Sequence, residues 1–284
     1  MTTAARDRDL SAAPSPGVPA RKARDRTVAS SKVFFALLRR DVVVARKELP
    51  FFLVRTIMQP LLFIIVFGAL LPRMGFVGAT YRAALLPGIL AISLTMSAIQ
   101  AVSLPMMQDF GWTKEIEDRL LAPVPTRVVA AEKIVATVIQ ALIAAIVVLP
   151  IARLIMGPIP GFSLAHGGEI ALIALLGATA FSSLGMWLGT AISPQQIGLM
   201  FSVIVAPMIF FGCAYYPWRG LDAVPVVKYL VLLNPLVYVA EGLRGVMTPS
   251  VPHMSLGVVT VALVLLAVAG WMLGMRSFYK RAIG

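Results

Sequence analysis

The chain has 284 residues, of which 59% are hydrophobic and only 13% are charged. Soluble domains carry about 25% charged residues, so the composition argues against a soluble protein and predicts an integral membrane protein. The net charge of +12 would suggest nucleic-acid binding in a soluble chain, but in a membrane chain it is explained more simply by Lys and Arg that collect in cytoplasmic loops.

The N-terminal part of the chain predicts a tail followed by an interfacial helix. Residues 1–29 are rich in Ala, Pro, Arg and Asp and predict a disordered cytoplasmic tail. No apolar run follows their first basic residues closely, as it would in a cleaved signal peptide. Residues 30–50 place basic side chains on one helical stripe and apolar ones on the other. This pattern predicts an amphipathic helix at the membrane interface, either as a simple anchor or as an elbow that also touches a partner.

Residues 51–284 form the predicted membrane domain, in which long uncharged runs alternate with short polar stretches. A membrane-spanning helix needs about 20 apolar residues, and these runs are continuous rather than alternating as in a β-barrel. The run between Glu169 and Arg219 is too long for one span and is interrupted at 193–196. The sequence therefore predicts an all-α membrane protein with six spans, at roughly 54–73, 84–106, 133–153, 170–192, 197–214 and 254–275.

The distribution of basic residues predicts the orientation of these spans. With the N-terminus inside, most of the 25 Lys and Arg fall on the cytoplasmic side, as the positive-inside rule requires. Six spans then leave the C-terminus inside as well. Arg is much commoner than Lys, which is typical of GC-rich bacterial genomes, so the expected location is the inner or plasma membrane of a bacterium.

Glycines at four-residue spacing inside the predicted spans favour close helix packing. They occur as Gly185 and Gly189 in the fourth span and as Gly270 and Gly274 in the sixth. Small residues at this spacing let two helices approach closely. We therefore predict a packing role for them and assign them no chemistry.

A short charged segment, GWTKEIEDRLLAPVPTRVVAAEK at 111–133, separates the second and third predicted spans. Its first part predicts two or three helical turns, with Ile116, Leu120 and Leu121 on one side and charged residues around the rest. The prolines at 123 and 125 then break the helix. A short amphipathic helix at a membrane exit suits docking in a groove of a soluble partner; the alternative is a plain interfacial turn.

The predicted outer loop before the last span holds an uncharged run at 229–240, interrupted by Asn234 and Pro235. The run is too short to cross a membrane, and the proline disfavours helix at the residue before it. We therefore expect two short helices that meet at this point, dip into the outer leaflet and return. Glu241 and Arg244 lie three residues apart on the second helix, where they could stabilise it modestly or pair across a protomer interface.

Motifs for chemistry are missing from the sequence. There is no P-loop, so we do not expect this chain to bind a nucleotide through one, and there is no GxSxG or HExxH motif. His166 and His253 are interpreted as solvated loop residues without metal-ligand spacing, and the single cysteine, Cys213, cannot form an intramolecular disulfide. Ser182 and Ser183 are interpreted as packing residues. We predict no catalytic residue, no metal and no cofactor in this chain.

No predicted span carries an ionisable residue near its centre, which argues against a proton-coupled carrier. If the chain moves a substrate, the energy must therefore come from another polypeptide. The alternatives are a membrane assembly or scaffold protein without transport activity and an ion-coupled carrier.

Three features, in this order along the chain, resemble the permease subunits of type-2 ABC exporters, a family that includes drug, lipid and polysaccharide export permeases. They are the basic amphipathic helix before the first span, EIEDRLLAPVPTRVVAAEK after the second and NPLVYVAEGLR before the last. The resemblance covers residues 30–281. It implies a permease of an ATP-driven exporter, working with a separate subunit that binds ATP and Mg²⁺ and with a second permease copy, identical or related.

The resemblance also implies roles for individual residues, in three groups. A coupling helix at 112–121 would dock on the ATP-binding subunit, through Trp112, Lys114, Glu115, Ile116, Glu117, Asp118, Arg119 and Leu120. Re-entrant helices within 217–247 would form the outer gate, with Trp218, Asn234, Pro235, Glu241 and Arg244. The first and fifth spans would line the path, with conduit candidates Phe63, Phe67, Met208, Phe210 and Phe211, which otherwise would be packed or lipid-facing side chains.

An uncharged path favours an amphipathic or apolar substrate over a small ion. A hydrophobic drug or a lipid-linked molecule fits this description. A polysaccharide is a further alternative, because a sugar conduit would also show aromatic rings.

Overall fold

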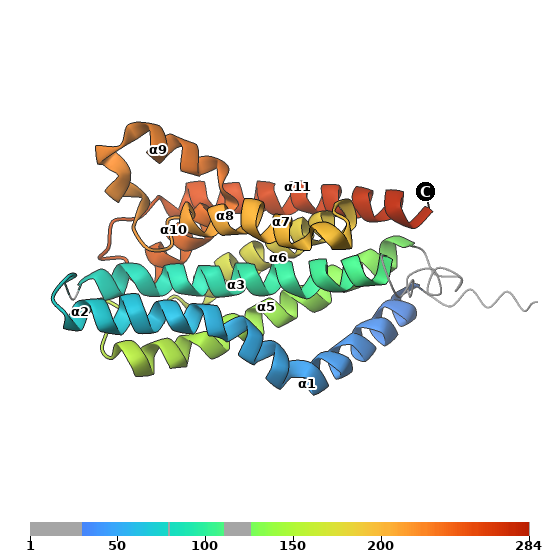
Figure 1. The fold of residues 1–284 in the computed structure, drawn as a ribbon, viewed down its shortest axis with the longest axis horizontal. Coiled ribbons are helices and arrows are strands. Elements are labelled where there is room, and N and C mark those ends of the chain that lie inside the picture. Colours follow the sequence, from blue (N-terminus) through green and yellow to red (C-terminus); the bar gives the residue numbers. More distant parts are fainter. Residues whose placement is uncertain (1–29, 79, 111–125, 284) are drawn as a thin grey trace, which may run out of the picture.

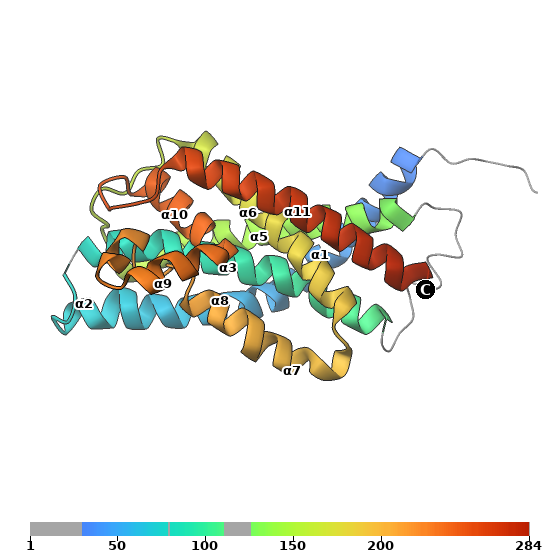
Figure 2. The ribbon, with the colours of Figure 1, turned by 90° about the horizontal axis from the view of Figure 1, so that it is seen from above.

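The computed structural model of the protein describes residues 30–78, 80–110 and 126–283. Within these ranges every regular element is a helix, which confirms the predicted all-α class. Most of the helices run lengthwise in one bundle (Figure 1). The start of α1 and the end of α11 lie at one end of the bundle, called here the C-terminal end, and α9 and α10 lie at the opposite end, called here the α10 end (Figures 1 and 2).

Among the described residues, four helices are long and apolar enough to cross a membrane. They correspond to the second, third, fourth and sixth predicted spans. These helices are α3 (Thr80–Gln108), α5 (Thr126–Met156), α6 (Gly167–Ala191) and α11 (Leu256–Ile283).

The first and fifth predicted spans correspond to two shorter apolar helical stretches, Ile57–Arg73 and Pro194–Phe210. Each stretch contains a π-helical segment, in which the amide bonds five residues back and the helix widens locally. The first consists of the end of α1 (Ser30–Phe63), π-helix η1 (Ile64–Leu70) and α2 (Leu71–Arg73). The second consists of η3 (Pro194–Gln196), α7 (Ile197–Leu199), π-helix η4 (Met200–Val205) and α8 (Ala206–Phe210).

The predicted interfacial helix at 30–50 and the start of the first predicted span are not separate elements. They belong to one helix, α1, which runs without interruption from Ser30 to Phe63. Figure 1 shows that this helix is bent, so that its N-terminal arm runs at an angle to the rest of α1 and ends at the C-terminal end of the bundle. The change from interfacial to apolar sequence therefore falls within a helix rather than between two helices.

Helix α3 is the central element of the bundle. It packs against α5, α6, α10 and α1, and 89% of its most apolar stretch is buried, compared with 17% for α11. The predicted close packing of the glycine residues is confirmed between α6 and α3 and between α11 and α6. A Cβ added to Gly189 of α6 would lie 2.8 Å from the Cα of Ser103 in α3, and one added to Gly274 of α11 would lie 2.8 Å from the carbonyl oxygen of Ser183 in α6.

Two short helices form a sharp corner at the α10 end. The chain passes through η5 (Trp218–Ala223), α9 (Pro225–Leu230) and η6 (Val231–Leu233) before α10 (Pro235–Met247) begins. The stretch Pro225–Leu233 and α10 are bent by 101° at Asn234. The predicted break at Asn234 and Pro235 is therefore confirmed, and α10 is buried while α9 stays at the surface (Figure 2).

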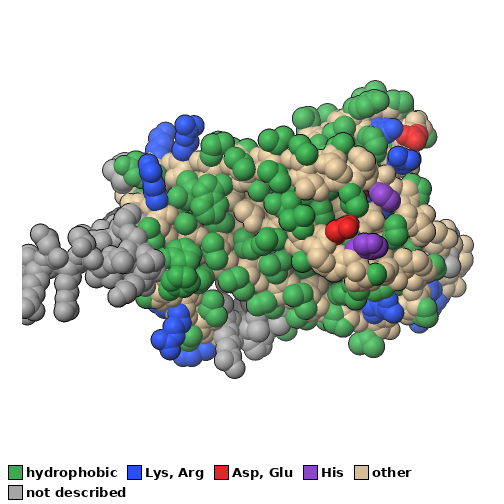
Figure 3. Space-filling model, turned by 180° about the vertical axis from the view of Figure 1, so that it is seen from behind, with side chains coloured by type: hydrophobic (Ala, Val, Ile, Leu, Met, Phe, Trp, Pro, Cys, Tyr) green, Lys and Arg blue, Asp and Glu red, His purple; other side chains and the backbone are tan. Residues whose placement is uncertain are grey.

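The surface is divided along the length of the bundle. In the face shown in Figure 3, Lys and Arg gather towards the two ends, and the band between them is mostly hydrophobic and uncharged, with one acidic group and His nearer the α10 end. This division is what a protein needs when its middle lies in the hydrocarbon layer and its ends lie in water.

Candidate functional site

All five predicted gate residues lie at the α10 end. Asn234 is the residue that caps the start of α10. Its backbone is extended (φ −88°, ψ 116°), and its side-chain oxygen accepts a hydrogen bond from the amide of Leu236 at 3.0 Å. Pro235 follows at the first helical position, where its missing amide costs nothing. The side-chain nitrogen of Asn234 (Nδ2) donates to the carbonyl of Met208 at 2.6 Å. The Asn-Pro pair therefore both starts α10 and ties it to α8.

Glu241 and Arg244, one turn apart on α10, form an ion pair with no exposed surface on either side chain. Glu241 also accepts hydrogen bonds from two backbone amides, that of Trp218 at 2.8 Å and that of Met254 at 2.7 Å. Trp218 is the first residue of η5 and Met254 lies between α10 and α11, so both amides approach the carboxylate from outside α10. Both oxygens of the carboxylate are therefore used as acceptors.

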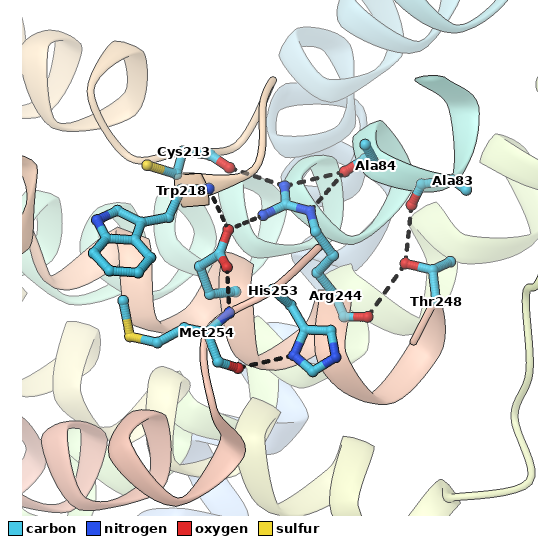
Figure 4. Close-up of polar contacts among 9 residues, drawn as sticks. Ala83, Ala84, Cys213, Trp218, Arg244, Thr248, His253 and Met254 are labelled. Atoms are coloured by element: carbon cyan, nitrogen blue, oxygen red, sulfur yellow. Dashed lines mark hydrogen bonds and ion pairs between the residues drawn. The ribbon is translucent and has the colours of Figure 1, made fainter. Parts of the chain in front are cut away.

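Arg244 donates to two carbonyl groups as well as to Glu241. Its Nε and Nη2 reach the carbonyl of Ala84 at 3.1 and 3.0 Å, and Nη2 also reaches the carbonyl of Cys213 at 2.9 Å (Figure 4). Beside it, the Thr248 hydroxyl donates to the carbonyl of Ala83 at 3.0 Å. A buried charge is tolerated only when it is paired and hydrogen-bonded, and here both charges meet this condition.

This polar cluster joins five places in the chain. They are α10 itself, the N-terminal part of α3 at Ala84, the segment after α8 at Cys213, the start of η5 at Trp218 and the loop before α11 at Met254. The predicted pairing of Glu241 with Arg244 is present within one chain. The alternative of a pair across a protomer interface is not what the structure shows, because the chain itself covers both side chains.

Trp218 fixes the loop that leads into α9. Its indole nitrogen donates to the carbonyl of Lys228 at 3.0 Å, and the Lys228 ammonium lies 4.4 Å from the ring centroid. The same ammonium pairs with Asp222 at 2.5 Å. The stretch from Trp218 to Lys228 is thus folded onto itself, and the Trp218 amide joins it to Glu241.

The segment after α8 lies directly on α3. Cys213 adopts a left-handed backbone conformation (φ 52°), which is uncommon for a residue other than glycine. Next to it, the carbonyl oxygen of Ala214 is so near Gly88 of α3 that an added Cβ would lie only 1.8 Å away. The backbones of the two segments are therefore in direct contact, and Gly88 is the residue that permits it.

Three of the five conduit candidates gather around a residue that the sequence did not single out. Tyr215 lies 5.0 Å from Phe63, 5.6 Å from Phe67 and 6.4 Å from Phe210, measured between ring centroids. Its hydroxyl is buried and has no hydrogen-bond partner among the described residues. A tyrosine in a mixed loop sequence carries no local signal that could have predicted this contact.

The other two conduit candidates lie outside this aromatic cluster. Met208 is buried and uses its carbonyl to accept from Asn234. Phe211 is 53% exposed and makes no ring contact among the described residues. The structure therefore brings together Phe63, Phe67 and Phe210 but not Met208 and Phe211.

A cavity of about 190 Å³ lies next to the aromatic cluster, between α1, α3 and the helices η4 and α8. An apolar cavity of about 150 Å³ is large enough for a benzene ring, so this one can take a ring or a short alkyl segment. Its lining has a single polar side chain, that of Gln59, and otherwise consists of Phe63, Met96, Phe201, Val205, Ala206, Ile209 and Phe210. Such a lining can bind an apolar group but offers no acid, base or nucleophile.

The predicted coupling residues cannot be placed in the same way. Trp112, Lys114, Glu115, Ile116, Glu117, Asp118, Arg119 and Leu120 lie in 111–125, outside the described residues. Within the described ranges, no three His, Cys, Asp or Glu side chains gather as ligands of a metal ion. The candidate site therefore consists of the polar cluster at the α10 end and the aromatic cluster with its cavity.

Replacing Asn234 with alanine tests the first contact of this site. The variant loses the helix cap, which is worth about 1 kcal/mol, and the hydrogen bond to Met208, which is worth about another 1 kcal/mol. We expect a loss of about 2 kcal/mol in unfolding free energy, measured by thermal unfolding in detergent. Asn234→Ser, which keeps a capping oxygen but cannot reach Met208 in the same way, should lose about half as much. Equal stability of both variants and the wild type would contradict the assignment.

Comparison with known proteins bears on most of this chain. Residues 32–248 match the family model described as ABC-2 type transporter. The inner membrane transport permease YadH of Escherichia coli (strain K12) is 30% identical over a 200-residue alignment that covers 67% of this chain and 75% of YadH. The protein of the same name from Shigella flexneri shows the same identity over the same shares of both chains.

Proposed function

Because the chain belongs to the ABC-2 type transporter family, we propose that it is the membrane-spanning permease subunit of an ATP-driven exporter, powered by a separate ATP-binding subunit. The observation that carries the proposal is the family match over residues 32–248 on a sequence that has no P-loop of its own. A transporter of this family without a P-loop needs a partner that hydrolyses ATP. That partner, and not this chain, would bind ATP and Mg²⁺.

In the proposed topology the chain crosses the membrane six times. The stretches Ile57–Arg73 and Pro194–Phe210 are the first and fifth spans. At 1.5 Å per residue each extends about 25 Å, which is close to the roughly 30 Å hydrocarbon layer. The N-terminal arm of α1 lies in the cytoplasmic interface, and both termini are cytoplasmic. The position of the start of α1 and the end of α11 at one end of the bundle supports this topology (Figure 1).

The α10 end is then the outer end, and α9 and α10 form the re-entrant pair of the outer gate. The angle of 101° between them supports this role, since the chain turns back before it could cross the membrane. Glu241 and Arg244 hold the gate segments together through the polar cluster. A second permease copy, identical or related, completes the path, and lipid surrounds both.

The substrate class follows from the conduit. Phe63, Phe67 and Phe210 line the proposed path together with Tyr215, and the adjacent cavity has only Gln59 as a polar side chain. Such a path desolvates an apolar group at little cost but would strip water from an ion without replacement. We propose an amphipathic or apolar substrate, such as a hydrophobic drug, a lipid or a lipid-linked glycan, moved out of the cell.

The coupling helix at 112–121 is the proposed contact with the ATP-binding subunit. Replacing Glu117 and Asp118 together with lysine should weaken docking at least about tenfold, because opposite charges that attract would become like charges that repel. The measurement is copurification with a co-expressed P-loop ATPase, sought among the products of neighbouring genes, together with export. Glu169→Lys, a charge reversal in the first turn of α6 at the α10 end, is the control and should leave docking unchanged. Full docking and full export by the Glu117/Asp118 variant would contradict the prediction of a coupling helix at 112–121.

The same experiment separates the proposal from its alternatives. A chain that forms no stable complex with any neighbouring ATPase would be an assembly or scaffold component of the membrane. A chain whose transport survives loss of the ATPase would be an ion-coupled carrier. Either result would overturn the proposed function.

A further inference from the structure

The point at which the chain leaves α3 is fixed by the end of α11. Phe110 is the last described residue before 111–125 and lies two residues beyond α3. Its ring meets that of Phe278 at 5.8 Å and at a steep angle of 68°, and the guanidinium of Arg281 lies 5.6 Å from its centroid. Phe278 is almost fully buried. The last turns of α11 therefore hold the chain where it leaves the bundle.

Arg281 is in turn anchored to α6. It donates through Nη1 to the carbonyl of Thr190, in the last turn of α6, at 2.8 Å. The hydroxyls of Thr190 and Ser277 are 2.7 Å apart, which joins α6 to α11 a second time. The exit from α3 is thus connected to two further helices through a continuous set of contacts.

The point at which the chain re-enters the bundle is fixed from the other side, by α1. Lys133, in the second turn of α5, donates to Asp41 of α1 at 2.5 Å. The two side chains are only 15% and 13% exposed. Asp41 directly follows Arg39 and Arg40, which are both exposed. One acid in this basic stretch of α1 therefore turns inward to a specific partner 92 residues away.

We propose that Asp41 and Arg281 are positioning residues of the coupling step. They fix where the chain leaves α3 and where it enters α5, and they carry a displacement of these two points into α1 on one side and into α6 and α11 on the other. This inference rests on the proposed function, because it needs an ATPase that moves the chain between these points.

The physical reason is that a displacement applied to a free helix end is lost locally. A helix end frays at little cost, because its last backbone groups have no helical partners. Coupling over a distance needs packed side chains and hydrogen bonds that connect the two places. Here both ends are tied by side-chain contacts: the pair of Asp41 and Lys133 is largely buried, and the exposed Arg281 donates to the buried Thr190. Movement of the points where the chain leaves α3 and enters α5 must therefore move α1, α6 and α11 as well.

The test uses the full chain in complex with its ATPase and needs no knowledge of the substrate. Leu233 is 82% exposed at the α10 end, so Leu233→Cys provides a reporter thiol there, while the native Cys213 is buried. The reaction rate with fluorescein maleimide is measured with and without ATP plus vanadate. The variants are Asp41→Lys, Lys133→Asp, the double swap of both, and Arg281→Gln. The controls are Arg40→Gln and Lys280→Gln, exposed neighbours on the same helices.

We expect the ATPase to copurify with every variant. In each of the three single variants the nucleotide-dependent change in labelling rate should shrink at least about fivefold, the lower end of typical allosteric coupling. The double swap restores an ion pair of reversed direction and should return the response to within about twofold of the wild type, since paired residues compensate each other. Both controls should respond like the wild type. A purely structural role would lower the yield of the complex and leave the nucleotide response of the purified complex unchanged.

Several results would overturn the inference while leaving the proposed function intact. One is a wild-type nucleotide response in Asp41→Lys and Arg281→Gln with the ATPase bound. Another is a double swap that does not recover, and a third is loss of the ATPase from the single variants, which would place these residues in the docking surface. If the charge reversals do not fold, the single variants Asp41→Asn and Lys133→Gln each remove the ion pair, and their nucleotide responses are compared with that of the wild type. Failure of the wild type itself to bind any ATPase would instead overturn the proposed function.

Discussion

Arg244→Met is expected to lower the unfolding free energy by about 3–5 kcal/mol, because removing one partner of a buried ion pair leaves the other as an uncompensated charge. Glu241 would stay buried with two backbone amides but no cation, and the carbonyls of Ala84 and Cys213 would each lose a donor. In thermal unfolding we expect the midpoint to fall by about 10 °C, given shifts of about 2–4 °C per kcal/mol in a chain of this size.

A double variant separates the cost of leaving one charge unpaired from the cost of replacing the side chains themselves. Glu241→Gln combined with Arg244→Met removes both charges, and its cost should be smaller than the sum of the two single costs, because no unpaired charge remains. Arg219→Met is the matched control, since Arg219 is exposed at the same end of the bundle, and it should change stability by less than about 0.5 kcal/mol. An Arg244→Met variant as stable as this control would mean that the polar cluster does not hold the α10 end together.

Gly88→Ala should have the second largest effect. The added methyl group would lie 1.8 Å from the carbonyl oxygen of Ala214, and a backbone group cannot turn away as a flexible side chain can. Either α3 or the segment that carries Tyr215 must move. Overpacking costs typically about 1–3 kcal/mol, and we expect about 3 kcal/mol here together with impaired export, because the aromatic cluster depends on the same segment.

The control for Gly88→Ala is the same substitution where there is room. Gly257, in the first turn of α11, has nothing within 4 Å of an added Cβ. Alanine is favoured over glycine in a helix by up to about 1 kcal/mol, so Gly257→Ala should be neutral or stabilising. Stability is measured by thermal unfolding and export by transport in the complex. If both variants behave alike, the close approach of Ala214 to Gly88 is not a constraint on this protein.

The sequence predicted those parts of the fold that depend on local chemistry. Long uncharged runs identified four helices because crossing a membrane requires length and apolarity in one continuous segment. The corner at Asn234 and Pro235 was predictable because a cap and a proline act within a few residues of their own position. The π-helical segments in the first and fifth stretches were not predictable, since nothing in their composition distinguishes them from ordinary apolar helix.

The sequence predicted which residues belong to the candidate site, but it did not predict the contacts that these residues make. Spacing showed that Glu241 and Arg244 could meet on one helix, but their other partners are backbone groups of Ala84, Cys213, Trp218 and Met254. Backbone groups occur at every residue, so no sequence pattern identifies the ones that are used.

The long-range ion pair shows the same limit. The charged residues around Asp41 and Lys133 were visible in the sequence, but pairing across 92 residues depends on how α1 packs against α5.

The unequal burial of the helices also determines which helices tolerate amino-acid substitutions. Helix α3 is surrounded by other helices on nearly every side, whereas α11 is covered over only a small part of its surface. A substitution in α3 therefore has to be matched by a second one in a neighbour, and simultaneous pairs are rare among random mutations. In α11 one apolar side chain can replace another over most of the surface. In a library of random variants, functional members should accordingly accumulate changes in α11 and keep α3 nearly as it is.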